Sequence, residues 1–356
     1  MRGNLKEKFW RKLVTSKKQH ICYQPVCLVL MVFSMFYRLV IYVRNFLFDV
    51  SVLKTTKVPA AVISIGNITT GGTGKTPLVA WLCNYFISNN VKTAVLTRGY
   101  KSKKDIADEP AMLAKAVHSV IVVVNPDRVA GAQKAIKENN AKLLVMDDGF
   151  QHRRLARDVN IVAIDATVPF GNGNLLPAGF LREPIASLKR ADAVIITRAN
   201  QNSPEIIDEI KKKVSKIKPD MVFAAAVHRP TYVKLIKDKQ IPLNELKDRK
   251  IYAFCGIGNP DAFFQTLKDM ALNIVGTTEY NDHHIYTNDD IAAIYEDARY
   301  KQAEYVVTTH KDWIKTALLS VEKFQIPFAA LMVELDFVDG KENIITLVNK
   351  ALEKYA

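Results

Sequence analysis

The chain has 356 residues and a formal net charge of +14, because 50 lysines and arginines outnumber 36 aspartates and glutamates. Its 49% hydrophobic and 24% charged content is typical of a folded globular protein and excludes a disordered or fibrous one. The positive charge predicts an anionic partner, which can be nucleic acid, a phosphorylated substrate or an anionic membrane surface.

The N-terminal region combines positive charge with an apolar run. Seven lysines and arginines lie in the first twenty residues against one acid, Glu7, and an apolar run follows over residues 26–43. The run has about the minimum length that crosses a bilayer, and no small-x-small cleavage site of a secretory signal follows it. It is either a buried first helix of a soluble domain or a membrane anchor that spans the bilayer or lies in its interface. The adjacent cations favour the anchor, and Arg38 within the run favours a helix with one polar side, so we predict a membrane-anchoring region over residues 1–50.

After residue 57, apolar runs alternate with amphipathic helix patterns. Runs that are apolar at every position are typical of strands buried on both faces of a parallel sheet covered by helices. The predicted strands are 60–65, 93–96, 120–124, 143–146, 161–164 and 193–196, and the predicted helices are 77–89, 109–117, 128–139 and 204–217. We therefore expect an α/β domain over residues 51–228.

A second, smaller α/β domain is expected further along the chain. Residues 229–250 are polar, rich in lysine and interrupted by Pro230 and Pro242, which is typical of a linker. Predicted strands at 251–254, 273–276 and 305–308 and predicted helices at 260–270 and 288–300 come after it. This pattern predicts a C-terminal domain over residues 251–356.

A glycine-rich loop is the most informative segment of the chain. The sequence Ile63-Ser-Ile-Gly-Asn-Ile-Thr-Thr-Gly-Gly-Thr-Gly-Lys-Thr76 leads from a predicted strand into a predicted helix. In a P-loop, backbone N–H groups and the positive end of the helix bind phosphate, Lys75 reaches the β- and γ-phosphates, and Thr76 offers its hydroxyl to Mg²⁺. Thr69 replaces the first glycine of the G-x-x-x-x-G-K-[ST] pattern, and the alternative is an ordinary strand-to-helix turn. The flanking strand and helix favour a P-loop.

Two carboxylates follow a buried strand of the same predicted sheet. Asp147 and Asp148 come directly after four apolar residues, at the carboxyl end of the strand, where the sites of open α/β sheets lie. Adjacent residues that leave a strand point in different directions, so one carboxylate can hold Mg²⁺ while the other faces the substrate or serves as a second metal ligand. The alternative is a solvated loop with two acids.

Phosphoryl transfer to a hydroxyl also needs a base and cations. Asp108 lies where a loop enters a helix and is either a helix N-cap or a base. The vicinal pair His283 and His284 is more often structural than metal-binding. Five arginines lie near predicted strand ends, where each is an ordinary surface residue by itself and the set suits an anionic substrate. They are Arg98, Arg128, Arg153, Arg154 and Arg182.

Several motifs, in order between residue 60 and about residue 312, resemble those of tetraacyldisaccharide 4′-kinase, the lipid A 4′-kinase family. They are the loop Gly66-Asn-Ile-Thr-Thr-Gly-Gly-Thr-Gly-Lys-Thr-Pro77, Thr97-Arg-Gly-Tyr100, Asp108-Glu-Pro110, Asp147-Asp-Gly-Phe-Gln-His152, Leu181-Arg-Glu-Pro184, Asp282-His-His284 and Lys311-Asp312. The Asp-Asp-Gly-Phe-Gln-His motif is highly specific, whereas Gly-Lys-Thr alone is not. The basic, apolar leader also matches the family.

The resemblance implies a P-loop lipid kinase that uses ATP and Mg²⁺. Its substrate would be an acylated glucosamine disaccharide 1-phosphate, phosphorylated at the 4′-hydroxyl on the cytoplasmic face of the bacterial inner membrane, where the first helix anchors the enzyme. A nucleic-acid partner is suggested only by the net charge and is not expected, because the cations cluster in the leader next to the apolar run. No protein partner is implied.

The resemblance also implies roles for individual residues. Thr76 and Asp148 would serve the metal, Asp147 would lie between metal and substrate, and Asp108 would be the base, oriented by His283. ATP would be held by Thr69, Thr70, Gly71, Gly72, Thr73, Gly74, Lys75 and Thr76, and the substrate or its phosphate would be contacted by Arg98, Arg128, Gln151, Arg182 and Glu183.

The chain departs from the family pattern at three positions. Ala107 and Lys101 stand where glycine is usual, and His310 replaces a common glutamate before Lys311-Asp312. These departures affect the geometry of loops beside the predicted catalytic residues.

The strongest rival function is a partner-switching P-loop ATPase that visits membranes, but its signature lysine is absent from the position of Thr70. A GTPase is disfavoured because no Asn-Lys-x-Asp guanine-reading motif is present.

Overall fold

The computed structural model describes residues 10, 24–99, 113, 114, 117, 119–317, 319 and 325–355. They divide into two compact units, one formed by residues 228–336 and the other, the P-loop unit, by the preceding residues together with 337–355. The long strands β7 (Val222–Leu235) and β12 (Phe328–Asp339) each contribute residues to both units.

The P-loop unit is built on a parallel sheet with the order β7-β6-β5-β1-β4-β2-β3. Its strands are β1 (Ala61–Gly66), β2 (Thr93–Thr97), β3 (Ile121–Val124), β4 (Leu143–Asp147), β5 (Val159–Asp165) and β6 (Ala193–Thr197). Every residue of β1, β2, β4, β5 and β6 is buried, because helices and loops cover both faces of the sheet. The predicted fold class, a helix-covered parallel P-loop domain with a smaller α/β part, is confirmed.

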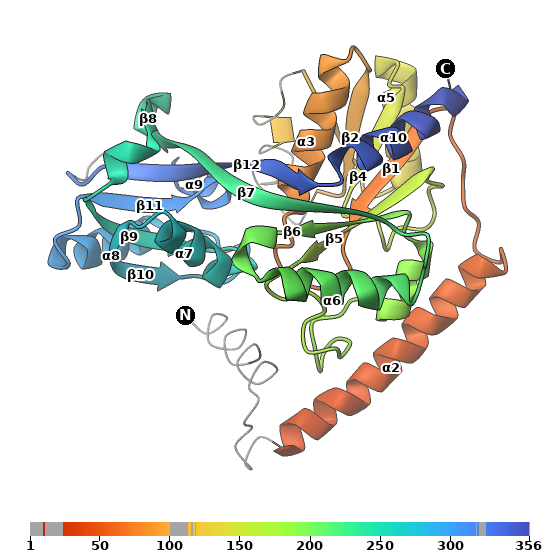
Figure 1. The fold of residues 1–356 in the computed structure, drawn as a ribbon, viewed down its shortest axis with the longest axis horizontal. Coiled ribbons are helices and arrows are strands. Elements are labelled where there is room, and N and C mark those ends of the chain that lie inside the picture. The colour runs from red at the N-terminus through yellow and green to blue at the C-terminus, as the bar shows by residue number, and fades with distance from the viewer. Residues whose placement is uncertain are drawn as a thin grey trace. The chain divides into compact units, whose positions relative to one another are not determined.

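Helices cover this sheet with apolar faces. They are α3 (Lys75–Ser88), α5 (Arg128–Asn139), α6 (Pro204–Ser215) and α10 (Lys341–Leu352) (Figure 1). The unit also contains the 3₁₀ turns η2 (Ile185–Arg190), η3 (Ala199–Gln201) and η7 (Glu353–Tyr355). Asp127 caps α5 by accepting hydrogen bonds from the N–H groups of Val129 and Ala130. The predicted helix at 109–117 lies largely outside the described residues.

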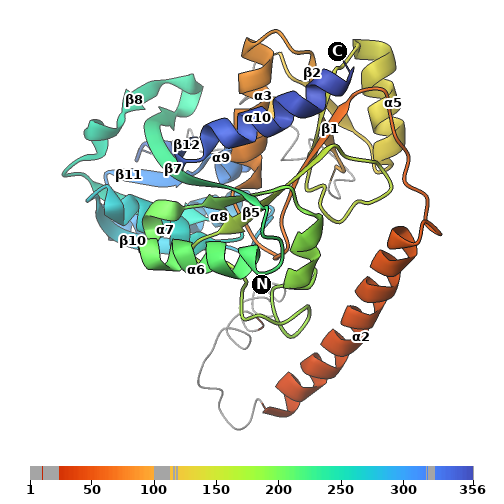
Figure 2. The same ribbon diagram turned by 45° about the vertical axis from the view of Figure 1, so that its right-hand side comes forward.

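The C-terminal residues return to the P-loop unit. Helix α10 packs on β1 and β5 (Figure 2) and buries Ile344, Ile345 and Val348. The division in the structure thus differs from the predicted one, which placed residues 251–356 in one C-terminal domain. Apolar residues on one face of α10 account for the difference, because that face is buried against the first sheet and not the second.

In the other unit, the strands β10, β9, β11 and β12 are parallel neighbours in this order, and β7 follows β12 in the sheet. Its elements are β8 (Gln240–Pro242), β9 (Lys250–Cys255), β10 (Asn273–Glu279), β11 (Tyr305–Thr309), α7 (Pro260–Asp269), α8 (Asn288–Tyr300), α9 (His310–Thr316) and the turns η4 (Ile236–Asp238) and η5 (Leu243–Leu246). Phe254, Trp313 and Phe328 stack at its core. Residues 229–250, predicted as a linker, instead include the second half of β7 and the antiparallel strand β8 beside it.

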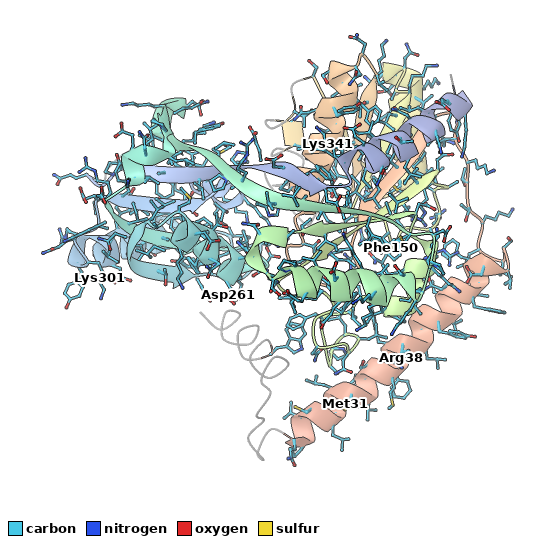
Figure 3. All side chains as sticks on the ribbon, viewed as in Figure 1. Met31, Arg38, Phe150, Asp261, Lys301 and Lys341 are labelled. Atoms are coloured by element: carbon cyan, nitrogen blue, oxygen red, sulfur yellow. The ribbon has the colours of Figure 1, made fainter. Side chains whose placement is uncertain are left out.

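The first described helix, α2 (Gln24–Asp49), is long and apolar. It has a mean hydropathy of 2.3 over its most apolar window, where only 11% of the residues are buried, so it meets the length and composition of a membrane span. Met31 and Arg38, labelled on α2 in Figure 3, are both exposed. The predicted apolar N-terminal helix is therefore present.

Candidate active site

The glycine-rich loop connects β1 to α3 as predicted for a P-loop. Gly74, the N-cap of α3, has φ 78°, a left-handed conformation that glycine adopts without strain. Gly66, the last residue of β1, lies so close to Phe150 that an added Cβ would be 2.6 Å from the Cβ of that residue. The Asp-Asp-Gly-Phe-Gln-His segment therefore passes directly over the carboxyl end of β1.

Residues at the carboxyl end of β6 bind carbonyl oxygens of this loop. The Thr197 hydroxyl donates to the carbonyl oxygen of Thr73 at 2.9 Å, and the Arg198 guanidinium donates to that of Gly72 at 2.9 Å. Arg198 is also paired with the carboxylate of Asp165, and both side chains are nearly buried. With their carbonyl oxygens bonded on this side, the loop peptides can present N–H groups to a phosphate on the other.

Asp165, Thr197 and Arg198 are functional candidates that our sequence analysis missed. The available signal was the one that identified Asp147, namely polar residues directly at the carboxyl end of a buried strand. Asp165 ends β5 and Thr197 ends β6, and these two residues are register partners. Their contact with the loop depends on the strand order, which apolar patterns do not reveal.

We expect Arg198→Gln to weaken ATP binding by at least about 10-fold, because the Gly72 carbonyl loses a charged hydrogen-bond donor. Since the variant also leaves Asp165 buried without its arginine, the double variant Asp165→Asn/Arg198→Gln serves as a second test that avoids an unpaired charge. Titration calorimetry measures the affinity, and the exposed Arg299→Gln is the control. ATP affinity equal to wild type in both Arg198 variants would contradict this supporting role.

Asp147 and Asp148 occupy different environments, as expected for adjacent residues that leave a strand. Asp147 is buried at the end of β4 and lies beside Ile65 of β1, just before the loop. Asp148 has φ 53°, and its side chain is 40% exposed. The turn at Asp148 thus directs the second carboxylate out of the sheet.

Asp148 lies between two cations at the mouth of the loop. The Lys75 ammonium is 3.4 Å from its carboxylate, and the Arg182 guanidinium donates to both carboxylate oxygens at 2.8 and 3.0 Å. Burial raises the pKa of Asp148, but the charges of Lys75 and Arg182 outweigh it and hold the pKa well below its ordinary value. Arg182 also donates to the Asn67 side-chain oxygen at 3.1 Å. Lys75, Asp148 and Arg182, three predicted site residues, are therefore together.

The other predicted contacts of this region differ in accessibility. Gln151 donates from its side chain to the carbonyl oxygen of Asn67 at 2.9 Å, so it lies beside the loop. Glu183 is fully buried, and its carboxylate accepts hydrogen bonds from Arg44, Asn45 and Arg190. Its predicted substrate contact stays a prediction.

Arginines gather at the carboxyl ends of β2 and β3. Arg98 follows β2 and is exposed, whereas Arg128 begins α5 and donates to the carbonyl oxygen of Asn125 at 2.7 Å. Burial and the charges of Arg128 and Arg157 lower the pKa of His152 to about 4, so His152 is neutral at physiological pH. This edge of the sheet suits a second anionic group.

We expect the stability of the protein to depend on pH through His152. Its pKa of about 4 in the folded protein is below the ordinary 6.5, so between these values the unfolded chain binds more protons. The free energy of unfolding therefore falls as the pH decreases through this window. In urea unfolding at pH 7 and pH 5, His152→Gln should lose less stability than wild type. Equal losses in the two proteins would contradict this effect.

The remaining catalytic candidates lie elsewhere. Asp108 lies outside the described residues, together with Ala107 and Lys101. His283, in the unit of residues 228–336, has φ 59° and follows Asp282, which pairs with Lys311 at 2.9 Å. The Lys311 ammonium is 3.4 Å from the His283 ring. The prediction that His283 orients Asp108 stays a prediction.

The site is suited to a nucleoside triphosphate and Mg²⁺. The loop peptides and Lys75 match a polyphosphate, and the side chains of Thr76 and Asp148 carry oxygen atoms, the ligand type that Mg²⁺ prefers. Within the described part of the chain, no three histidine, cysteine, aspartate or glutamate side chains cluster as a metal cage.

Comparison with known proteins finds one family by three routes: a family model, similar sequences and a similar crystal structure. The family model for tetraacyldisaccharide-1-P 4′-kinase matches residues 26–353. A tetraacyldisaccharide 4′-kinase from Halothermothrix orenii is 35% identical over an alignment of 376 residues, which covers 97% of both chains. One from Syntrophus aciditrophicus is 38% identical over 337 residues, covering 87% of this chain and 89% of its own. A crystal structure of LpxK from Aquifex aeolicus in complex with ATP has a TM-score of 0.69 and 27% identity, covering 92% of this chain and 99% of that one.

Proposed function

The chain belongs to the tetraacyldisaccharide-1-P 4′-kinase family, and on that premise we propose that it transfers the γ-phosphate of ATP to the 4′-hydroxyl of a tetraacylated glucosamine disaccharide 1-phosphate. The observation that carries this function is the cluster of Lys75, Asp148 and Arg182 at the P-loop. It brings two phosphate-binding cations and one metal-binding carboxylate to one place. A partner-switching ATPase is not favoured.

Residues 69–76 bind the donor in this proposal. The loop N–H groups and Lys75 hold the phosphates, and Arg182, which contacts Asp148 in this structure, stabilises charge on the transferred group. Thr76 and Asp148 hold Mg²⁺, which neutralises phosphate charge when bound. Asp147 lies between the metal ligands and the acceptor.

Asp108 accepts the proton of the attacking hydroxyl. The 4′-oxygen forms a bond to the γ-phosphorus, the bond to the bridging oxygen of ADP breaks, and the proton moves to the Asp108 carboxylate. A positioned base of this kind contributes roughly 10²- to 10⁴-fold to the rate. Arg98, Arg128 and Gln151 contact the acceptor or its 1-phosphate, and the 1-phosphate suits the arginines at the ends of β2 and β3.

We further propose that α2 lies in the interface of the inner membrane on its cytoplasmic face. Two features support an interfacial helix: exposed apolar residues on one side, such as Met35, Leu39 and Phe46, and polar contacts to the P-loop unit on the other. A helix held by its polar side along the protein leaves its apolar side for the acyl region. The lipid acceptor would then reach the enzyme without leaving the membrane.

Replacing Met35, Leu39 and Val43 with serine should weaken binding to anionic vesicles at least about 10-fold, because each apolar side chain that is lost contributes about 1.5–3 kcal/mol when fully buried. Co-sedimentation with vesicles measures the bound fraction. The exposed apolar Val338, which lies outside α2, gives the control Val338→Ser. Unchanged binding by the triple variant would rule out this face as the anchor.

The function is tested with γ-labelled ATP and total lipid from cells that accumulate the disaccharide 1-phosphate. We expect a labelled lipid with wild-type protein and Mg²⁺, and none with Lys75→Ala. Hydrolysis of ATP without a labelled lipid would instead support an ATPase and overturn the proposal.

A further inference from the structure

Helix α2 contacts the rest of the P-loop unit along one face. Ser34, Tyr37, Ile41, Arg44 and Phe48 follow one another at intervals of three or four residues, so they share this face. Ser34 donates to the carbonyl oxygen of Leu175 at 2.9 Å, Ile41 is buried, and Phe48 lies under the Arg153 guanidinium. We call these five residues, together with Asn45, the body face of α2.

The body face is hydrogen-bonded to two consecutive residues of the P-loop unit, Arg182 and Glu183. The Tyr37 hydroxyl donates to the carbonyl oxygen of Arg182 at 2.9 Å. Arg44 and Asn45 donate to the two carboxylate oxygens of Glu183 at 3.2 and 3.0 Å. Arg190 adds a third bond to Glu183 at 2.8 Å. Because the Glu183 side chain is fully buried, losing one of these partners would leave its carboxylate with one hydrogen bond fewer and without access to water.

The first of these two residues, Arg182, is attached to the phosphate loop, and Glu183 directly follows it in the chain. The Arg182 N–H donates to the carbonyl oxygen of Ile68 at 2.7 Å, and its guanidinium contacts Asp148 and Asn67. The helix is therefore linked to the Asp148 carboxylate in three steps: polar contacts to Glu183 and to the Arg182 carbonyl, the backbone that joins these two consecutive residues, and the Arg182 guanidinium. They do not involve the exposed apolar side of α2.

We propose, on the basis of the kinase function above, that the body face of α2 positions Arg182 for phosphoryl transfer. In this arrangement α2 has two separable roles: its apolar side binds lipid, and its body face keeps Arg182 at the phosphate site. Tyr37, Arg44 and Asn45 are positioning residues that act through Arg182 and Glu183. Turnover therefore requires the contacts of the body face with Arg182 and Glu183 even where membrane binding does not limit the rate.

Two arginines of the same helix provide a matched test. Arg44 contacts Glu183, whereas Arg38 is exposed. In detergent–lipid mixed micelles with saturating lipid, Arg44→Gln should lower kcat at least about 10-fold, since it removes a charged hydrogen bond from a buried carboxylate. Arg38→Gln should keep wild-type turnover, and Arg44→Lys should recover part of the loss. Both glutamine variants should lose a similar, small part of their binding to anionic vesicles, about 5-fold, because each removes one charge worth about 1 kcal/mol near the surface and no apolar surface.

The stoichiometry of ATP binding separates positioning from unfolding, because it counts folded molecules. If kcat is calculated per ATP-binding molecule and is still lowered, the positioning role is supported. If activity falls only in proportion to the number of ATP-binding sites that are lost, the proposal is overturned. Tyr37→Phe removes a single hydroxyl without leaving a charge unpaired, and should lower kcat about 2- to 10-fold with full ATP stoichiometry. Wild-type kcat in both Tyr37→Phe and Arg44→Gln would overturn the proposal. An inactive wild-type chain would instead count against the kinase function itself.

Discussion

Lys75→Ala should lower kcat/KM for phosphoryl transfer by about 10²- to 10³-fold, because one lost charge at the transferred phosphate costs roughly 3–4 kcal/mol of transition-state stabilisation. Lys75 follows the left-handed Gly74 at the start of α3, and its ammonium is 3.4 Å from Asp148. The backbone of the loop therefore places Lys75 at the mouth of the loop. Without Lys75, Asp148 also keeps one cation fewer near the incoming phosphates.

Lys142→Ala is the matched control for this substitution. Lys142 is exposed and lies directly before β4, so it is at the end of that strand opposite to Asp147. Its loss should leave turnover within about 2-fold of wild type, as is usual for surface positions. Turnover of Lys75→Ala above about a tenth of wild type would contradict the P-loop function, since a single tenfold step corresponds to only 1.4 kcal/mol.

The core strands of the P-loop unit were predictable because both of their faces are buried. The segment 143–146 is apolar at every position, and the structure extends this strand only to Asp147. The loop at Lys75 was predictable because glycine spacing, a strand and a helix coincide within one short segment. Local patterns sufficed wherever the same few residues determine both the structure and its chemistry.

Contacts that depend on strand order were not predictable in the same way. Arg198 and Asp165 support the loop only because β5 and β6 are neighbours. The second half of β7 falls in the predicted linker because residues 229–250 are polar, rich in lysine and interrupted by Pro230 and Pro242. This part of the strand is mostly not fully buried, so it tolerates polar side chains. The placement of Glu183 under α2 likewise joins residues about 140 positions apart.

Asp148→Asn should reduce kcat about 10²- to 10³-fold and raise the Mg²⁺ concentration for half-maximal activity, because a neutral amide is a poorer Mg²⁺ ligand than a carboxylate. The substitution preserves shape and leaves Lys75 and Arg182 in place. It also removes a negative charge that faces the phosphates, since the lowered pKa keeps Asp148 ionised at neutral pH. Without Mg²⁺, ATP should therefore bind to the variant at least as tightly as to wild type.

A higher Mg²⁺ requirement combined with undiminished ATP binding in the absence of Mg²⁺ distinguishes a metal ligand from a residue that only stabilises the loop. If Asp148 only held Lys75 and Arg182 in position, Asp148→Asn would weaken ATP binding with and without Mg²⁺ and leave the Mg²⁺ requirement unchanged. Titration of turnover with Mg²⁺ and calorimetry of ATP binding in EDTA distinguish the two cases. Glu138→Gln, which removes a charge from the exposed side of α5, is the control and should change neither measurement. A wild-type Mg²⁺ requirement in Asp148→Asn would transfer the role of metal ligand to Asp147, the other carboxylate at the end of β4.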